Sequence, residues 1–393
     1  MSSYLLLAFA TFLVAFDFQN LRSWSGGQTI KPGREKSQDF TIVVPVFGHP
    51  RYFEAERLLQ YRHKVLVAME ISSPSMAAFA DELDAHGWTV ERLVVEDPNP
   101  AALVAAALPA VDTTYTFRLD SDTDIGDDAA AAVAAADVAG ADLCSIKCAV
   151  GNRRNVVTKL QALEYRMAML SRHFRPWLTS GACFLARTDA LRQIMARHSK
   201  WTPGEDIETG RTALALRMRI RHLDMVVHTD APESWRALFR QRRLWWAGTF
   251  RHWWVNVDRN LLHLPVLTSY YLIAIWVTWY VKWWTMLSPG AVISSLPYVY
   301  CAYLFVTVTA NLQVASPWMV VFPFYALVQV LVMPVFGALT YFELARRRRH
   351  VGRYEFGYRR REVLRVIRRV TTYPSGRSEA QAVSSLRASS SSG

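Results

Sequence analysis

Short apolar runs alternate with alanine-rich stretches between residues 40 and 139, and this alternation limits the fold more than any other feature of the chain. The runs are rich in β-branched and aromatic residues and end at Gly, Pro or Asp, which is typical of buried strands. Strands that alternate with helices predict an α/β domain with a mainly parallel sheet. The expected strands lie at residues 41–46, 63–74, 88–96 and 113–120, and the expected helices at 76–85, 100–110 and 129–139.

An acidic stretch, "DSDTDIGDD" at residues 120–128, follows the fourth expected strand directly. It is unusual in this chain, because the 393 residues carry a net charge of +12. In open α/β sheets, ligands bind outside the carboxyl ends of the strands. We therefore expect Asp120 and Asp122 to belong to a ligand site.

Three interpretations of the acidic stretch can be compared. A solvated acidic loop is the simplest of them. A calcium loop needs Gly at its sixth position and Glu at its twelfth, but Ile125 and Ala131 stand there. The third interpretation is a divalent metal held against a nucleotide diphosphate, because such ions take one or two carboxylates together with substrate phosphates. The D-x-D spacing fits the third interpretation but does not decide it alone.

Long apolar segments precede and follow this domain. Residues 4–18 are nearly all apolar and predict an uncleaved N-terminal membrane anchor. The basic residues after it place the next segment in the cytosol by the positive-inside rule. Segments 264–284, 292–312 and 318–342 are each long enough to span a bilayer. We therefore expect an integral protein of the plasma membrane with a cytosolic catalytic domain.

A basic tract follows the last apolar segment. It holds eleven Arg between residues 346 and 369, against Glu355 and Glu362. Its position beside apolar segments favours an anionic membrane surface as its partner over nucleic acid. We expect residues 346–370 on the cytosolic face, which requires one apolar segment, 288–312, not to span. The expected organisation is an anchor at 1–20, a cytosolic α/β domain at 38–230, amphipathic interface helices at 231–260, transmembrane helices at 261–345 and a basic, partly disordered tail at 346–393.

Two further stretches carry candidate functional residues. "GEDIET" at 204–209 can be simply the acidic first turn of a helix. "APESWRALFRQRRLWWAG" at 231–248 can be an amphipathic helix at a membrane surface, with Trp and Leu on one face and Arg on the other.

Together, four stretches resemble membrane-bound family 2 glycosyltransferases over residues 40–345. They are "DSDTDI", "SGACFLARTDAL", "GEDIET" and "APESWRALFRQRRLWWAG", in the order and approximate spacing of that family. The chain is similar to hyaluronan, chitin and cellulose synthases and to the nodulation chito-oligosaccharide synthases. The resemblance implies a GT-A domain, an α/β fold with a Rossmann-like mixed sheet, combined with α-helical transmembrane segments.

The resemblance also implies roles for single residues and a cofactor, Mn²⁺ or Mg²⁺. Asp206 would be the general base. Leu244 stands where the family motif has Arg, so that role passes to Arg243, and Glu70 stands where an Asp is usual. The implied donor-binding residues are Pro45, Glu70, Asp120, Gln241 and Arg243, the metal ligands Asp122 and Asp120, and the acceptor-binding residues Trp245 and Glu205.

The implied activity is that of an inverting, processive polysaccharide synthase that moves a sugar from a UDP-sugar to a growing β-linked glycan. Inversion needs a base opposite the leaving group, and a leaving diphosphate needs positive charge to neutralise it. One alternative is a non-processive membrane glycosyltransferase that acts on a lipid or short glycan. Another is a nucleotide-sugar-binding regulator without turnover. The expected partners are the UDP-sugar, the glycan acceptor and the lipid bilayer, without nucleic acid; the sequence leaves the oligomeric state open.

Overall fold

The computed structural model of the chain describes residues 29–347, apart from 51–52, 127, 174, 256–288, 313 and 315. Three of the expected membrane-associated segments lie outside these described residues. They are the anchor at 1–20, the segment 264–284 and all but the first two residues of the basic tail at 346–393.

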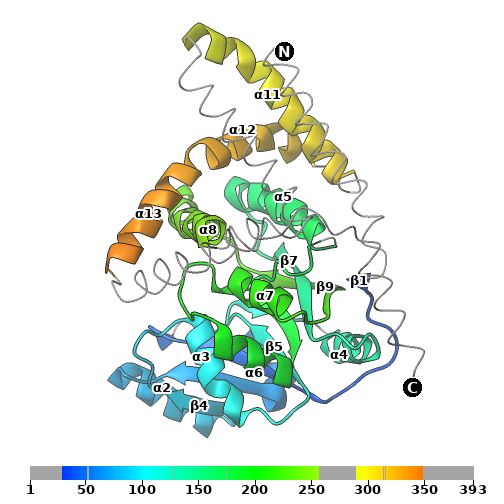
Figure 1. Cartoon of the computed structure of the whole chain (residues 1–393), viewed down its shortest axis with the longest axis vertical. Helices are drawn as coiled ribbons and strands as arrows, with labels where there is room; N and C mark the ends of the chain where they lie inside the picture. The colour runs from blue at the N-terminus through cyan, green and yellow to red at the C-terminus, as the bar shows by residue number, and fades with distance from the viewer. Residues whose placement is uncertain are drawn as a thin grey trace, which may run out of the picture.

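A nine-stranded mixed sheet forms the centre of the described chain (Figure 1). Its strands are β1 Thr29–Ile30, β2 Phe40–Val46, β3 Val65–Glu70, β4 Thr89–Leu93, β5 Tyr115–Leu119, β6 Thr123–Asp124, β7 Leu143–Val150, β8 Cys183–Arg187 and β9 Ile220–Thr229. Their order is β1-β9-β7-β8-β5-β2-β3-β4, with β6 paired to β9. The pairs β2–β3, β2–β5, β3–β4, β7–β9 and β1–β9 are parallel, whereas β8 is antiparallel to both β5 and β7. The four expected strands are β2 to β5, and the mainly parallel sheet is confirmed.

The alanine-rich stretches form helices where the sequence predicts them. Ser73 and Asn99 cap the first two, because each side chain accepts a hydrogen bond from the backbone N–H three residues later. A proline follows each cap at the first helical position, where no N–H is needed. The helices are α2 Pro74–Ala85, α3 Pro100–Ala107, α4 Ala129–Val138, α5 Val156–Leu170, α6 Thr188–Arg197, α7 Glu205–Ala215, α8 Trp235–Val255, α11 Pro289–Ala310, α12 Trp318–Leu331 and α13 Met333–Arg347, with 3₁₀ helices η2 Ala55–Lys64, η3 Leu108–Ala110 and η4 Ser171–His173.

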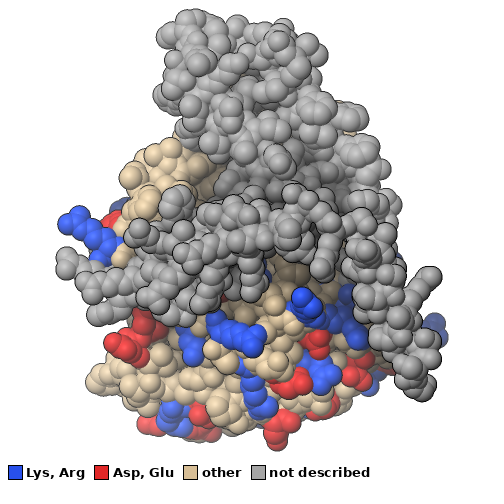
Figure 2. Space-filling model, in the orientation of Figure 1, with Lys and Arg blue, Asp and Glu red and all other residues tan. Residues whose placement is uncertain are grey.

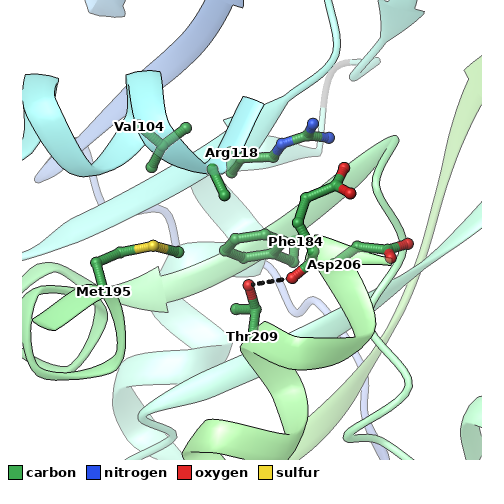
Figure 3. Close-up of a pocket in the computed structure, with 8 residues that line it drawn as sticks. Val104, Arg118, Phe184, Met195, Asp206 and Thr209 are labelled. Atoms are coloured by element: carbon green, nitrogen blue, oxygen red, sulfur yellow. Dashed lines mark hydrogen bonds between the residues drawn. The ribbon is translucent and has the colours of Figure 1, made fainter. Parts of the chain in front are cut away.

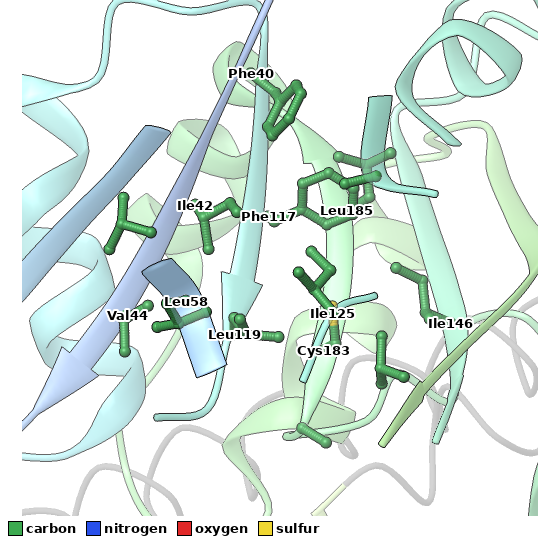
Figure 4. Close-up of a cluster of buried hydrophobic side chains, with 14 of the residues drawn as sticks. Phe40, Ile42, Val44, Leu58, Phe117, Leu119, Ile125, Ile146, Cys183 and Leu185 are labelled. Carbon is green, nitrogen blue, oxygen red and sulfur yellow. The ribbon is translucent and has the colours of Figure 1, made fainter. Parts of the chain in front are cut away.

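Both faces of the central strands are buried. Along β2, Ile42 and Val44 belong to one apolar cluster, whereas Val43 belongs to another on the opposite face. Helices α2 and α4 contribute to the first cluster, and α3, α6 and α7 to the second. Figure 4 shows part of the first cluster, where the rings of Phe40 and Phe117 lie 5.6 Å apart, centroid to centroid. Burial on both faces explains why these strands appear in the sequence as continuous apolar runs.

A helical layer lies beyond the sheet. Leu160 of α5, Leu238 of α8 and Phe322 of α12 share one apolar cluster, and α13 packs along α8 (Figure 1). The approach is close at Gly337, where a Cβ atom would lie 2.5 Å from the Cβ of Trp246, so a larger residue cannot fit without displacement. Figure 2 shows acidic and basic side chains interspersed over the visible surface of the sheet-bearing part.

The apolar C-terminal helices differ from the straight spans that the sequence predicts. Among the described residues, no single helix is both long and apolar enough to cross a bilayer. Trp318–Gln329 and Met333–Arg346 pass that test only as a pair with a bend of 40° between them. Pro334 gives a physical reason, because proline removes a backbone N–H and clashes with the preceding turn. The segment 288–312, which is expected not to span, lies mostly in α11, and this helix contains Pro297.

Candidate functional site

Three strand ends carry predicted site residues at one edge of the sheet. Strands β5, β2 and β3 are parallel neighbours, so their carboxyl ends point the same way. Pro45 is buried near the end of β2, in register with Ala68. Glu70 ends β3, where it is 6% exposed and its Oε1 accepts a hydrogen bond of 2.7 Å from the Ser72 N–H. Asp120 follows β5 directly, so the fold brings these three residues to a common edge.

Asp120 carries an ion pair that sequence reasoning did not include. Its Oδ1 lies 2.8 Å from Nη2 of Arg118, which stands two residues earlier on the same side of β5. Although 39% of the Asp120 side chain is exposed, partial removal from water raises the pKa of its carboxyl to about 6. Asp122 and Asp206 add to this rise, and Arg118 opposes it. The carboxylates at this strand end are therefore close enough to repel one another.

Asp122 and Asp124 have different surroundings. The hydroxyls of Thr123 and Thr229 each donate to Oδ1 of Asp122 at 3.3 Å. Oδ1 of Asp124 instead accepts a hydrogen bond of 2.9 Å from the Gly126 N–H, which closes a turn. Asp124 therefore has a structural role in this turn and needs no ligand, whereas Asp120 and Asp122 remain candidates for ligand binding.

Asp206 lies in the first turn of α7. Its Oδ2 accepts a hydrogen bond of 2.9 Å from the Gly181 N–H, and its Oδ1 accepts one of 2.8 Å from the Ile207 N–H. The Thr179 hydroxyl donates to the backbone carbonyl of Asp206. These contacts fix the orientation of the carboxylate against the loop that leads into β8.

Glu205 and Asp206 line a pocket together with Arg118, which we call the carboxylate pocket (Figure 3). In Figure 3, Val104 and Met195 lie on one side of the pocket, and Arg118 and Asp206 on the other. The remaining lining residues are Ala101, Phe184 and Thr209.

Two groups in the carboxylate pocket have perturbed environments. Burial raises the pKa of Glu205 to about 7, Asp206 adds to the rise, and Arg118 opposes it. The side chain of Arg118 is only 5% exposed, and its Nη1 has no hydrogen-bond partner among the described residues. A buried N–H without a partner is costly, so a ligand that accepts a hydrogen bond there would be stabilised. The alternation of side chains along β5 could have revealed Arg118 from the sequence.

The motif residues of α8 do not line the carboxylate pocket. Oε1 of Gln241 accepts a hydrogen bond of 2.5 Å from Nη1 of Arg242. Nε of Arg243 donates to the hydroxyl of Thr340 on α13 at 3.1 Å. The indole of Trp245 is 46% exposed, and its ring lies 5.8 Å from that of Tyr165. The described contacts of Gln241, Arg243 and Trp245 are therefore all with residues of the helical layer.

Arg242 is a second residue that the sequence did not single out. It is 1% exposed, and its Nη2 lies 2.6 Å from Oε2 of Glu164 on α5. Its guanidinium lies 4.0 Å from the ring centre of Trp245. Burial opposes its charge, but Glu164 holds the pKa of Arg242 above its usual range. Arg242 therefore joins α8 to α5. Its neighbour Arg243 lies about 100° further round the helix and faces α13 instead.

The residues at the end of β5 fit a divalent cation that binds together with a phosphate. Among the described residues, no three His, Cys, Asp or Glu side chains gather closely enough to hold an ion by themselves. Mg²⁺ needs only one or two carboxylates when substrate phosphates complete its shell, and Asp120 and Asp122 can provide two. A cation there would also offset the repulsion from Asp122, which adds to the effect of burial on the pKa of Asp120.

Glu205→Gln is expected to stabilise the fold at alkaline pH. The pKa of Glu205 is raised to about 7 in the folded chain, because the fold favours the protonated carboxyl. The stability that the protonated carboxyl contributes is fully present below the ordinary pKa near 4.5, and it is lost as the pH rises through 7. One pKa unit corresponds to 1.36 kcal/mol, so the variant should gain roughly 1–3 kcal/mol at pH 8. Thermal unfolding of both proteins at pH 5 and pH 8 checks this. An equal gain at both pH values would contradict it.

Comparison with known proteins agrees with this fold. The profile of glycosyl transferase family group 2 matches residues 116–342. A search of curated protein sequences gave no match. Among solved structures, the mannosyltransferase PcManGT from Pyrobaculum calidifontis in complex with GDP-Man and Mn²⁺ is 14% identical, with a TM-score of 0.51 over 85% of this chain and 98% of that one.

Two other solved structures are more distant. TarS from S. aureus in complex with UDP-GlcNAc is 14% identical, with a TM-score of 0.37 over 78% of this chain and 92% of that one. Glucosyl-3-phosphoglycerate synthase from Mycobacterium tuberculosis is 15% identical, with a TM-score of 0.34 over 58% of this chain and 81% of that one. The likeness to PcManGT supports the GT-A fold. The family profile includes the acidic strand end, α7 and the α8 motif, and it matches more than half of the chain. The chain therefore belongs to glycosyl transferase family group 2.

Proposed function

We propose that this glycosyltransferase moves a sugar from a nucleoside diphosphate sugar to an acceptor hydroxyl at the carboxylate pocket, with inversion at the sugar C1. The observation that carries the proposal is the pocket itself. Glu205, Asp206 and the partly unpaired Arg118 line it, and Arg118 connects it to Asp120. Groups with opposed charges and perturbed pKa values in one pocket are typical of catalytic sites.

In the proposed reaction, Asp206 takes the proton of the acceptor hydroxyl as that oxygen attacks C1. The bond from C1 to the phosphate oxygen breaks, and its electron pair leaves with the nucleoside diphosphate. The N–H groups of Gly181 and Ile207 hold the Asp206 carboxylate in place, which reduces the reorganisation that the proton transfer requires. Glu205, beside it, would contact the acceptor. A divalent cation bound to Asp120 and Asp122 would neutralise charge on the diphosphate.

A panel of donors tests the proposal. The purified full chain is incubated with UDP-sugars and GDP-sugars, each with Mn²⁺ or Mg²⁺, and nucleoside diphosphate release is measured with and without a glycan acceptor. We expect release from a UDP-sugar, as the family resemblance implies; PcManGT was solved with GDP-Man, so GDP-sugars form the second arm. Absence of acceptor-dependent release from every donor would overturn the proposal.

We also propose that the product is a β-linked glycan that lengthens processively. Trp245 supports this, because an indole that is 46% exposed beside Tyr165 offers an aromatic surface on which sugar rings can stack. A non-processive enzyme would use the same surface for one acceptor. The length distribution of the product separates the two: processive synthesis gives long chains at low conversion, whereas single transfer gives acceptors extended by one sugar.

We further propose that the chain is held at a membrane, with its catalytic domain on the cytosolic side of the plasma membrane. Large apolar side chains on the C-terminal helices support this, since exposed apolar patches mark interaction surfaces. The basic tract at 346–369 would add attraction to anionic lipid. The exposed apolar residues of this region include Phe305, Val320, Phe324, Val328, Leu339 and Phe342.

The full chain is expected to float with vesicles that contain anionic lipid in a density gradient. Phe324 and Leu339 are 60% and 61% exposed, and withdrawal of each from lipid is worth roughly 1.5–3 kcal/mol. The double variant Phe324→Asp, Leu339→Asp should therefore float at least several-fold less. The control is Val94→Asp, because Val94 is 78% exposed beyond β4, away from these helices. Equal loss in both variants would contradict the assignment of the surface.

A further inference from the structure

The segment that precedes α7, residues 198–204, is bonded to the last turns of α8. Nε2 of His252 donates to the carbonyl of Gly204 at 2.6 Å. Nε2 of His198 donates to the carbonyl of Glu205 at 2.8 Å, while its Nδ1 accepts from the Lys200 N–H at 2.8 Å. Burial lowers the pKa of both histidines, which keeps them neutral. The carbonyls of Gly204 and Glu205 therefore each accept a hydrogen bond from an imidazole N–H.

Arg251 of α8 makes the strongest of these connections. Its side chain is 1% exposed, and its Nη2 lies 2.8 Å from both Oε2 of Glu208 and Oγ of Ser199. Its Nη1 donates to the carbonyl of Trp201 at 3.1 Å, and the guanidinium lies 4.7 Å from the Trp201 ring centre. Although burial opposes it, Arg251 holds the pKa of Glu208 well below its usual range. One buried guanidinium thus joins α8, the segment 198–204 and the first turn of α7.

The backbones of the two elements are also in direct contact. A Cβ atom on Gly248 of α8 would lie 3.1 Å from both Cα and N of Gly204, and 3.3 Å from the carbonyl carbon of Pro203. Gly204 has φ +91°, a conformation that favours glycine. A side chain at either glycine would push the start of α7 away from α8.

Helix α13 also packs against the segment 198–204. Tyr341 is fully buried, and its ring lies 5.7 Å from that of Trp201 at an angle of 79°. Trp201 therefore contacts both Tyr341 and the guanidinium of Arg251. The start of α7 is thus fixed through α8 by the helical layer, which lies outside the sheet that positions Asp120.

We propose that Arg251, His252 and Gly248 are positioning residues for the carboxylates Glu205 and Asp206, which follow Gly204 directly. The proposal rests on the function proposed above for these carboxylates. The last turns of α8 fix the first turn of α7, and the side chain of Asp206 leaves that turn toward Gly181. These residues lie beyond the stretch 241–245, whose described contacts are with α5 and α13, so their role is distinct from that of the motif.

Gly248→Ala is the sharpest test, because alanine favours the helix and the nearest atoms to its Cβ belong to the backbone of Pro203 and Gly204. The matched control is Gly33→Ala, since a Cβ at Gly33 would meet nothing within 4 Å. The backbone must shift by a few tenths of an ångström to accept this Cβ, and misplacement by about 1 Å can reduce a rate about 100-fold. We therefore expect kcat of Gly248→Ala to fall by about 3- to 10-fold, with KM for the donor within about twofold. Gly33→Ala should match the wild type.

Hydrogen–deuterium exchange gives a readout that needs no substrate. The Gly181 N–H is bonded to Asp206 and the Ser199 N–H to Glu208, so both amides should exchange faster in Gly248→Ala, while those of β2 and β3 stay unchanged. Arg251→Lys, which keeps the charge, is the second variant and should show the same changes to a smaller degree.

The outcomes separate the two proposals. Faster exchange at Gly181 with unchanged kcat would overturn the positioning role, as would exchange equal to the wild type in both variants. If the wild type turned over no nucleotide sugar, the proposed function would fail, while exchange would still decide whether α8 fixes the start of α7. Loss of exchange protection throughout the sheet in both variants would mean a general loss of folding and would overturn the specific role.

Discussion

Asp206→Asn is expected to lower the rate of sugar transfer by about 10²–10⁴-fold, because a positioned general base contributes that much. The substitution keeps the shape and one acceptor oxygen of the side chain but removes its ability to take a proton. Its amide nitrogen also cannot accept the hydrogen bond that Oδ2 accepts from the Gly181 N–H. Binding of the donor should survive, since the proposed metal and diphosphate contacts lie at Asp120 and Asp122. Single-turnover transfer and equilibrium binding of the nucleoside diphosphate, measured on the same preparation, check both parts.

The neighbouring carboxylate provides the matched control. Glu205→Gln is expected to reduce transfer less than Asp206→Asn, since Glu205 is assigned to the acceptor. The raised pKa of Glu205, about 7, makes it the rival base, because a base is most effective when its pKa is near the working pH. Near-normal transfer by Asp206→Asn together with loss of transfer in Glu205→Gln would reassign the base to Glu205.

Removal of the divalent metal is expected to abolish turnover. A metal that stabilises a leaving diphosphate is worth several kcal/mol, and 1.36 kcal/mol is tenfold in rate, so excess chelator should reduce turnover at least ~10³-fold. Asp122→Ala should have a comparable effect, with restoration by high Mn²⁺ incomplete. The measurement is nucleoside diphosphate release against added Mn²⁺ or Mg²⁺ after chelation.

Asp124→Asn is the control for that series. Asparagine keeps the Oδ1 that accepts from the Gly126 N–H, and the turn has no assigned metal role. This variant should therefore keep the metal dependence of the wild type. Undiminished turnover in excess chelator would remove the metal from the mechanism, and equal losses in Asp122→Ala and Asp124→Asn would remove the distinction between the two acids.

The sequence predicts the first half of the sheet well, for a physical reason. Strands β2 to β5 are buried on both faces, so their apolar runs are continuous and their boundaries are marked by turns. Strands β7 and β9 alternate more, with Lys147 and Asp224 paired between them, and β8 is recognisable only as part of a family motif. The antiparallel pairing of β8 with β5 and β7 depends on tertiary contacts that no local pattern encodes.

The residues of the candidate site likewise fall into those that the sequence predicts and those that it does not. Residues next to strand ends, Asp120 and Asp122, could be predicted because the chemistry follows directly from their position. Arg118 could have been found from the alternation along β5, since it stands two residues before Asp120. Arg251 could not, because a buried arginine whose partners lie far along the chain is recognised only when those partners are known. Arg243 is a different case. Its motif implies a diphosphate contact, whereas its described contact is with Thr340 on α13, because helical geometry turns it away from Arg242.

The anomeric configuration of the product tests the central claim most directly, which is that one base activates the acceptor and no covalent sugar intermediate forms on the chain. A single displacement inverts C1, whereas a double displacement retains its configuration. With an α-linked nucleoside diphosphate sugar as donor, nuclear magnetic resonance of the first product formed by the wild-type enzyme should show a β-glycosidic linkage. An α linkage in that product would contradict the account.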